Sequence, residues 1–249
     1  MRHSILVTRP AAQTIGLCQR LVAAGFAPLA TPVVRIEPNP DILSQLVARV
    51  NVAQWAVFVS PSAIDLAWPL LDGHLGAHVR LATVGRASAG KLALLAGRSV
   101  CHPREDSDST ALLASACFAP QPGQKVALIK GEGGRTELIE ALTVRGVAVD
   151  TLACYRRVPE DLDWELIDMA LSSAVQPAIV MTSGDAADTL FALAGESRRA
   201  TLQSALYAVP HPRIAERLGM LGAGTVITTS AGDDALVAAL CTWFAAYDR

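Results

Sequence analysis

The sequence of 249 residues has no long apolar run, although 51% of its residues are hydrophobic and only 18% are charged. No stretch of about 18 uncharged apolar residues occurs, which argues against a membrane-spanning helix. The first residues lack the layout of a secretory signal, so we expect a cytoplasmic protein. The net charge is −2 and no basic stripe occurs, so nucleic acid is not an expected partner. No apolar interface helix stands out, and a monomer is expected.

Cysteine and histidine are scarce and scattered. The five cysteines are odd in number and never form a CxxC pair, which predicts reduced thiols. His74 and His78 are four residues apart but lack a carboxylate partner nearby, so no metal ion is expected. The segment GEGGRT at residues 131–136 matches neither a P-loop nor a dinucleotide-binding motif. It predicts a turn before a helix, and no organic cofactor is expected.

What the sequence does contain is an internal repeat of three segments. The matching pairs are 5–35 with 126–156, 57–70 with 180–193, and 81–97 with 206–222. Each segment has an apolar β-rich run, a turn and then a helical pattern. In the first pair a glycine, Gly25 or Gly146, fits the end of the helix. Nearly continuous apolar strands alternating with helices predict an α/β fold with parallel sheets, in two similar halves.

Two domain arrangements fit this repeat. Two tandem domains would meet near residues 120–124, PQPGQ. Alternatively, the runs at 26–38 and 147–159 would each leave one sheet and cross over as a connector, because both are longer than an ordinary strand of about five or six residues. The residue pattern leaves both arrangements open.

Small hydroxyl residues, glycines and bases follow the predicted strands. Ligands of open α/β sheets bind at the carboxyl ends of the strands, where N–H groups that begin a helix can hold an anion. The candidate substrate contacts are Arg9, Ser60, Ser62, Arg86, Lys130, Gly131, Arg135, Thr182, Ser183 and Thr228. Singly, each would serve as a helix cap or a turn. Two copies of the same surface favour a site for a polyanion.

Tyr155 is one of only three tyrosines and precedes Arg156 and Arg157 on the second long run. A phenol beside two cations can donate a proton or a hydrogen bond, which makes Tyr155 the candidate catalytic residue. The simpler interpretation is a residue that packs between strands, next to solvated arginines.

Seven stretches together carry a resemblance to a known family. They are LVTRP at 6–10, FVSPSAI at 58–64, TVGRASA at 83–89, IKGEGGRTEL at 129–138, CYRR at 154–157, MTSGDAADTL at 181–190 and TTSAGDDALVAAL at 228–240. In this order, over nearly the whole chain, they resemble the uroporphyrinogen-III synthase family. One departure is Ser62, where the family often carries an asparagine.

The resemblance implies the crossover arrangement. A discontinuous α/β domain would combine residues 1–35 and 160–249, and a second α/β domain would be inserted at 38–154. Connectors at 31–37 and 153–159 would form a two-stranded antiparallel pair. Both domains would have a flavodoxin-like or Rossmann-like parallel sheet, with a cleft between them.

The resemblance also implies an enzyme of tetrapyrrole biosynthesis, a cyclising hydro-lyase. Its substrate would be hydroxymethylbilane, a linear tetrapyrrole with an acetate and a propionate on every ring. The enzyme would remove the hydroxyl, invert the terminal pyrrole through a spiro intermediate and close the ring to uroporphyrinogen III, without metal or cofactor. Tyr155 would assist departure of the hydroxyl, and the candidate contacts would hold carboxylates. The alternative is a non-catalytic two-lobed protein that senses a small ligand.

Overall fold

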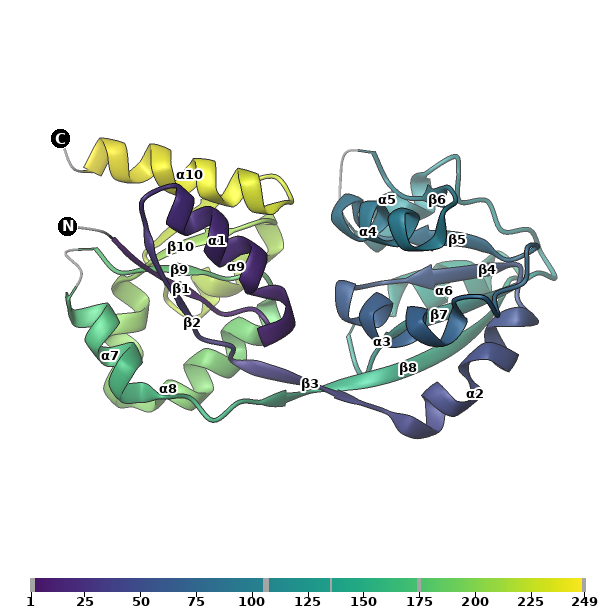
Figure 1. Ribbon diagram of the computed structural model, residues 1–249, viewed down its shortest axis with the longest axis horizontal. Helices are drawn as coiled ribbons and strands as arrows, with labels where there is room; N and C mark the ends of the chain where they lie inside the picture. The colour runs from purple at the N-terminus through teal and green to yellow at the C-terminus, as the bar shows by residue number, and fades with distance from the viewer. Residues whose placement is uncertain (1–2, 105–107, 135, 174–175, 248–249) are drawn as a thin grey trace. The chain divides into compact units, whose positions relative to one another are not determined.

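The computed structural model describes residues 3–104, 108–134, 136–173 and 176–247. The chain divides into two compact units. Unit 1 consists of Met1–Arg35 and Val158–Arg249, and unit 2 is Ile36–Arg157. Unit 1 is therefore built from both ends of the chain, as the colours of Figure 1 show, and the observed division does not fall near residues 120–124.

Unit 1 contains a parallel five-stranded sheet in the order β11-β10-β9-β1-β2. The strands are β1 (Ser4–Val7), β2 (Ala27–Ala30), β9 (Ala178–Val180), β10 (Leu206–Val209) and β11 (Thr225–Thr228). One apolar face packs against α1 (Ile15–Ala23) and α10 (Asp233–Tyr247). The other packs against α7 (Trp164–Ser173), α8 (Gly184–Ser204) and α9 (Pro212–Met220). A short 3-10 helix, Ala11–Gln13, precedes α1. Figure 1 shows these two helical layers.

Unit 2 contains a six-stranded sheet in the order β3-β8-β7-β4-β5-β6. The strands are β3 (Val34–Pro38), β4 (Trp55–Phe58), β5 (Arg80–Thr83), β6 (Val100–Cys101), β7 (Lys125–Gly131) and β8 (Ala148–Pro159). One face packs against α2 (Pro40–Asn51), α3 (Pro61–Leu71) and α4 (Arg86–Ala96). The other packs against α5 (Ser109–Ala114) and α6 (Glu137–Val144). Side chains along β4 alternate between the two cores, as the period of a strand requires.

The repeat read from the sequence is confirmed by the order of the strands. Strands β2, β1, β9, β10 and β11 of unit 1 follow the same order as β8, β7, β4, β5 and β6 of unit 2. The order in unit 1 is that of a doubly wound, flavodoxin-like sheet, and unit 2 has the same order in space although β4, β5 and β6 precede β7 and β8 along the chain. The helix stops also agree, because Gly25 and Gly146 have left-handed φ angles of 92° and 73°. The α/β fold with two mainly parallel sheets is thus confirmed.

The two long runs of the sequence form different structures. Residues 26–38 break into β2, which belongs to the sheet of unit 1, and β3, which belongs to that of unit 2. Residues 148–159 form the single strand β8. Glu160 N–H donates to the Val33 carbonyl at 3.0 Å, and Asn39 N–H donates to the Cys154 carbonyl at 2.9 Å. The partner number falls as the residue number rises, so β3 and β8 run antiparallel.

The prediction that all cysteines are reduced is wrong for two of them. Cys101, which ends β6, and Cys117, which follows α5, form a disulfide with their Cα atoms 5.6 Å apart. The packing of α5 brings a loop to the edge strand, and a rule based on residue spacing cannot detect such a contact. Cys18, Cys154 and Cys241 are free thiols. Among the described residues, the helices are too short or too polar to cross a membrane.

Candidate active site

The order of the strands reverses once in each sheet, between β7 and β4 in unit 2 and between β1 and β9 in unit 1. In open α/β sheets, ligands bind at the carboxyl ends of the strands beside such a reversal. The predicted contacts found there are Ser60, Lys130 and Gly131 in unit 2 and Arg9, Thr182 and Ser183 in unit 1. Each unit therefore presents predicted site residues where its topology favours a ligand.

In unit 2 a chain of hydrogen bonds links Arg157, Tyr155 and Ser60. Ser60 caps α3, since its Oγ accepts the Ala63 N–H at 3.0 Å. The Tyr155 hydroxyl lies 2.9 Å from the same Oγ, and Arg157 Nη2 donates to that hydroxyl at 3.3 Å. The Arg157 guanidinium also lies 5.5 Å from the centroid of the Tyr155 ring, within reach of a cation–π contact. Tyr155 is only 1% exposed, so its phenol is a buried link in this chain.

Gly131 provides the space for that phenol. It ends β7, where the register with β8 shifts so that Lys130 pairs with Ala153 but Gly131 pairs with Tyr155. A Cβ on Gly131 would lie 2.6 Å from Cε2 of Tyr155, closer than real side chains approach. The sequence marked Gly131 as a substrate contact. The structure explains why this residue is a glycine, because the absence of a side chain leaves space for the tyrosine ring.

Lys130 carries its charge in an unfavourable environment. Burial of the ammonium lowers the pKa of Lys130, the positive charge of Arg157 lowers it further, and Glu137 opposes the change. Two cations therefore lie near the Ser60–Tyr155 contact, and a bound carboxylate would stabilise both. The neighbouring thiol is not a nucleophile, since burial raises the pKa of Cys154 to about 11.

The equivalent position in unit 1 is electrostatically different. Arg9 lies just after β1 and Lys130 lies next to the last residue of β7. The Arg9 guanidinium, however, donates to Asp233 at 2.6 Å, at the start of α10. The side chains of Arg9 and Asp233 are 15% and 29% exposed. Ser183 does repeat the role of Ser60, because its Oγ accepts the Ala186 N–H at 3.3 Å and caps α8. The repeat thus preserves the helix cap but not the charge balance.

The other predicted contacts have varied surroundings. Ser62 lies in the first turn of α3 and is 7% exposed. Arg86 begins α4 and donates to the Arg104 carbonyl at 2.5 Å. Thr182 is half-buried before α8, and Thr228 is exposed at the end of β11. Arg135 lies outside the described residues.

Arg157 is the site residue to which sequence reasoning gave too little weight. The sequence left open whether Arg157 acts on the phenol of Tyr155 or is only solvated beside it, and in the structure it donates to the phenol. The spacing contained the signal, because residues two apart on a strand point to the same face. The partner of Arg9 had no such signal, since Asp233 is 224 residues further along the chain.

Comparisons with known proteins agree with this architecture. The model of the uroporphyrinogen-III synthase HemD family matches residues 17–238. The uroporphyrinogen-III synthase of Escherichia coli (strain K12) is 27% identical over 251 residues, covering 95% of this chain and 99% of that protein. The enzyme of Salmonella typhimurium is 28% identical, with the same coverage of 95% and 99%.

Solved structures show the same fold. A crystal structure of a mutant uroporphyrinogen III synthase from the extremely thermophilic bacterium Thermus thermophilus aligns with a TM-score of 0.66 at 18% identity, over 99% of both chains. The uroporphyrinogen-III synthetase of Helicobacter pylori 26695 aligns with a TM-score of 0.59 at 12% identity, over 100% of both chains.

The two sheets and the polar groups at their reversal points define a two-unit, doubly wound α/β enzyme. The family model covers most of the sequence of this enzyme. The chain belongs to the uroporphyrinogen-III synthase family. Its predicted role as a cyclising enzyme of tetrapyrrole biosynthesis is confirmed, and the sensor alternative is not favoured.

Proposed function

We propose that the enzyme binds hydroxymethylbilane at the carboxyl ends of its parallel strands, with Lys130 and Arg157 holding a substrate carboxylate in unit 2. A carboxylate next to Lys130 would offset both the burial of the ammonium and the repulsion by Arg157. An arginine and a lysine together favour a carboxylate strongly, because their hydrogen bonds to it are charge-assisted.

Ser60, Ser62, Gly131 and Arg86 are proposed to contribute further polar contacts in unit 2. Thr182, Ser183 and Thr228 are proposed to do so in unit 1. Ser60 and Ser183 already cap their helices, so each also places free N–H groups of a first helical turn near its hydroxyl. Arg135 completes the proposed set by its position in the sequence.

We further propose that Tyr155 assists departure of the substrate hydroxyl through Ser60. Arg157 donates to the phenol oxygen, so the phenol hydrogen is directed to Ser60 Oγ. Ser60 Oγ also accepts the Ala63 N–H, which leaves the serine hydrogen free to bond to the leaving oxygen. Hydrogen bonds in such a chain polarise one another, and the charge of Arg157 strengthens the last donor. In this arrangement Ser60 contacts the substrate, and Tyr155 positions and polarises the Ser60 hydroxyl.

Modest assistance of this kind suits the reaction. An electron-rich pyrrole expels hydroxide readily, so the chemistry needs neither paired carboxylates nor a strong nucleophile. The larger task is to hold the linear chain so that the inverted terminal ring closes before simple cyclisation occurs. Several weak contacts to many carboxylates would provide that orientation.

The Arg157–Tyr155–Ser60 chain carries this proposal, and a coupled assay tests it. A deaminase supplies hydroxymethylbilane, and chromatography separates uroporphyrinogen isomer III from isomer I. Tyr155→Phe keeps the ring but removes the hydroxyl, and Ser60→Ala removes the proposed final donor. We expect both variants to lower kcat, and the double variant to lose little more than Ser60→Ala alone. Full kcat and normal isomer III in Tyr155→Phe would contradict the role of the phenol.

A further inference from the structure

A pocket of about 510 Å³ lies in unit 2 along the edge strand β6. Strand β5 separates β6 from β4, and neither Ser60, Lys130 nor Tyr155 lines the pocket. Its wall includes Arg80, which begins β5, and Arg98, which precedes β6. The pocket is therefore distinct from the proposed active site.

The described residues that line this pocket carry only positive charge. Arg80, Arg98 and Arg104 line it together with His102, and none of the described residues around it is acidic. Among the described residues, no carboxylate forms an ion pair with any of the three arginines. Three guanidinium groups that share one pocket repel each other, and the described residues supply no counter-charge there.

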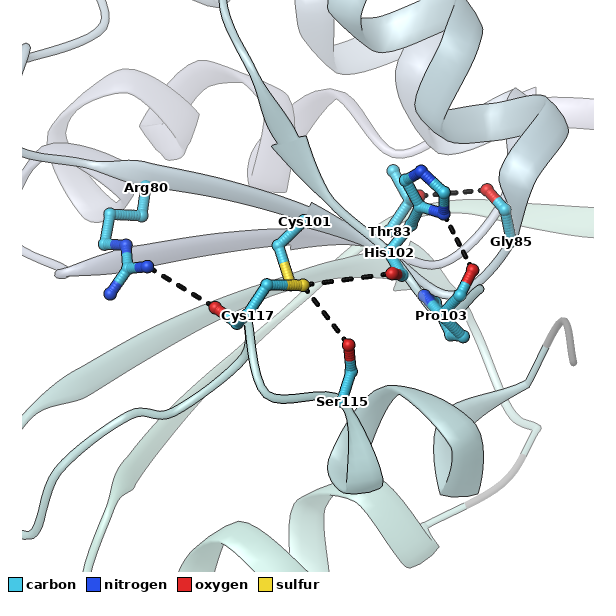
Figure 2. Close-up of a disulfide and its surroundings, with 8 residues drawn as sticks. All are labelled: Arg80, Thr83, Gly85, Cys101, His102, Pro103, Ser115 and Cys117. Carbon is cyan, nitrogen blue, oxygen red and sulfur yellow. Dashed lines mark hydrogen bonds between the residues drawn. A yellow bond between two sulfur atoms is a disulfide. The ribbon is translucent and has the colours of Figure 1, made fainter. Parts of the chain in front are cut away.

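One of these arginines is held in place by its neighbours, and a second has an unpaired buried donor. The Arg80 guanidinium stacks on Trp55, 4.0 Å from the ring centroid. Figure 2 shows its second contact, in which Nη2 donates to the Cys117 carbonyl at 3.4 Å. Arg98 Nη2 is buried and has no hydrogen-bond partner among the described residues. A buried donor without an acceptor is unfavourable, and more so when it is charged. The unpaired donor of Arg98 therefore indicates that an acceptor is needed which the described residues do not supply.

We propose that this pocket binds a small oxyanion that carries at least two negative charges, such as a phosphate group or a polycarboxylate. The ligand would accept the unpaired N–H group of Arg98 and neutralise the repulsion among the arginines. Guanidinium groups suit this chemistry, because their planar N–H groups match the oxygens of phosphate and carboxylate.

The disulfide forms part of the wall of this pocket. Cys101 and Cys117 both line it, and their bond fastens the loop after α5 to the edge strand (Figure 2). The Cys117 carbonyl is also the acceptor that holds Arg80. Reduction would release this side of the pocket, so the oxidised protein is expected to bind the anion more tightly.

Isothermal titration at low ionic strength tests the proposal, with inorganic phosphate and citrate as separate probes. Oxidised wild-type protein should bind at least one of them saturably, and Arg98→Gln should weaken binding by about tenfold or more through loss of a charge-assisted contact. Arg20→Gln is the matched control, because Arg20 lies on the surface of unit 1 and pairs with Asp234. It should bind like the wild type. The stronger probe would identify phosphate or carboxylate as the preferred group.

Two further variants keep the test decisive. Arg80→Lys keeps the positive charge but weakens the stacking on Trp55. This variant replaces Arg98→Gln in the titration if Arg98→Gln does not fold. Tyr155→Phe should retain anion binding, whatever its effect on the formation of isomer III. Equal binding by Arg98→Gln and wild type, or no saturable binding by wild type, would overturn the proposal.

Glu105 and Asp106 follow Arg104 in the sequence and lie outside the described residues. Neutralising both as Glu105→Gln and Asp106→Asn gives the final comparison. Phosphate or citrate binding that occurs only in this double variant would also overturn the proposal, because the chain's own carboxylates would then occupy the pocket.

Discussion

The Tyr155 ring lies directly against the backbone of Gly131, where a Cβ would stand 2.6 Å from Cε2 and 2.7 Å from Cζ. The shift in register between β7 and β8 creates this contact, because it places Gly131 opposite Tyr155. The ring in turn positions its hydroxyl 2.9 Å from Ser60 Oγ. A backbone irregularity thus determines where the phenol points.

Gly131→Ala should displace the ring and break the contact with Ser60. We expect a loss of about 1–3 kcal/mol of unfolding free energy, the usual cost of overpacking a core. We also expect kcat to fall as it does in Tyr155→Phe. Urea denaturation and the coupled assay measure the two effects.

Gly90→Ala is the control for that substitution. Gly90 lies within α4 and a Cβ there would meet nothing within 4 Å. Alanine is favoured over glycine in a helix by roughly 0.5–1 kcal/mol, so this variant should be as stable as the wild type or more so. If Gly131→Ala behaved like Gly90→Ala, the contact with Tyr155 would not be a constraint.

Substrate affinity should decline at alkaline pH through Lys130. Its pKa is lowered by burial and by Arg157, so the ammonium loses its proton at a lower pH than the ordinary value of 10.5. Only the protonated form attracts a carboxylate, and KM should therefore rise as the pH increases through the lowered pKa. In Lys130→Gln the KM should be higher at neutral pH and this alkaline rise should be absent. An unchanged alkaline rise in Lys130→Gln would assign it to another group.

Replacing Arg9 and replacing Lys130 should have different effects on stability and KM, although the two residues occupy equivalent positions in the repeat. Arg9 is paired with Asp233, so Arg9→Ala should mainly reduce stability, by about 1 kcal/mol for a partly exposed ion pair. Lys130→Ala should mainly raise KM. Thermal unfolding and steady-state kinetics on both variants separate the two effects. A raised KM in Arg9→Ala with unchanged stability would make Arg9 a substrate contact.

Asp150 should contribute stability that is lost in acid. Hydrogen bonds from Arg49 lower the pKa of this carboxyl, with further help from Lys125, while burial opposes them. The contribution is therefore complete above the unfolded pKa of about 3.9 and declines as the pH falls through the lower folded value. Asp150→Asn should destabilise the protein at pH 7, and the effect should shrink as the pH falls through the lowered folded pKa. Asp234→Asn is the control, because the Asp234 side chain is 91% exposed, and it should change the stability little at any of these pH values.

Cys117→Ser should lower the stability of unit 2 in the oxidised protein. The disulfide joins residues separated by 16 positions, and closing a loop of that size restricts the unfolded chain by about 3 kcal/mol. Cys241→Ser is the control, because Cys241 is an exposed free thiol. Denaturation with and without a reducing agent should show that only Cys117→Ser is insensitive to reduction. If reduction leaves the wild type unchanged, the disulfide does not contribute to stability.

The fold could be predicted because its signals are local and occur twice. Apolar strands, helical periodicity and the glycine stops at Gly25 and Gly146 are each readable within a short window. The match between the two halves then indicated that both adopt one architecture. The pattern left open only how the chain was shared between the halves.

The site was less accessible to prediction because it depends on contacts over long distances. Ser60 could be recognised as the cap of a helix, but its bond to Tyr155 spans 95 residues. The register shift that brings Gly131 opposite Tyr155 has no signature in the sequence. The Cys101–Cys117 bond likewise depends on how α5 packs. Electrostatic differences between Arg9 and Lys130 follow from neighbours that the repeat does not preserve.

The interrupted course of unit 1 has a consequence for synthesis on the ribosome. Strand β1 pairs Ile5 with Ala178 in β9, whereas unit 2 is one continuous stretch that ends at Arg157. Domains generally fold as units while the chain emerges, and contacts distant in sequence form late. We expect unit 2 to fold first, because β1 cannot pair with β9 until β9 has been synthesised. The nascent chain would thus mature from its middle outward.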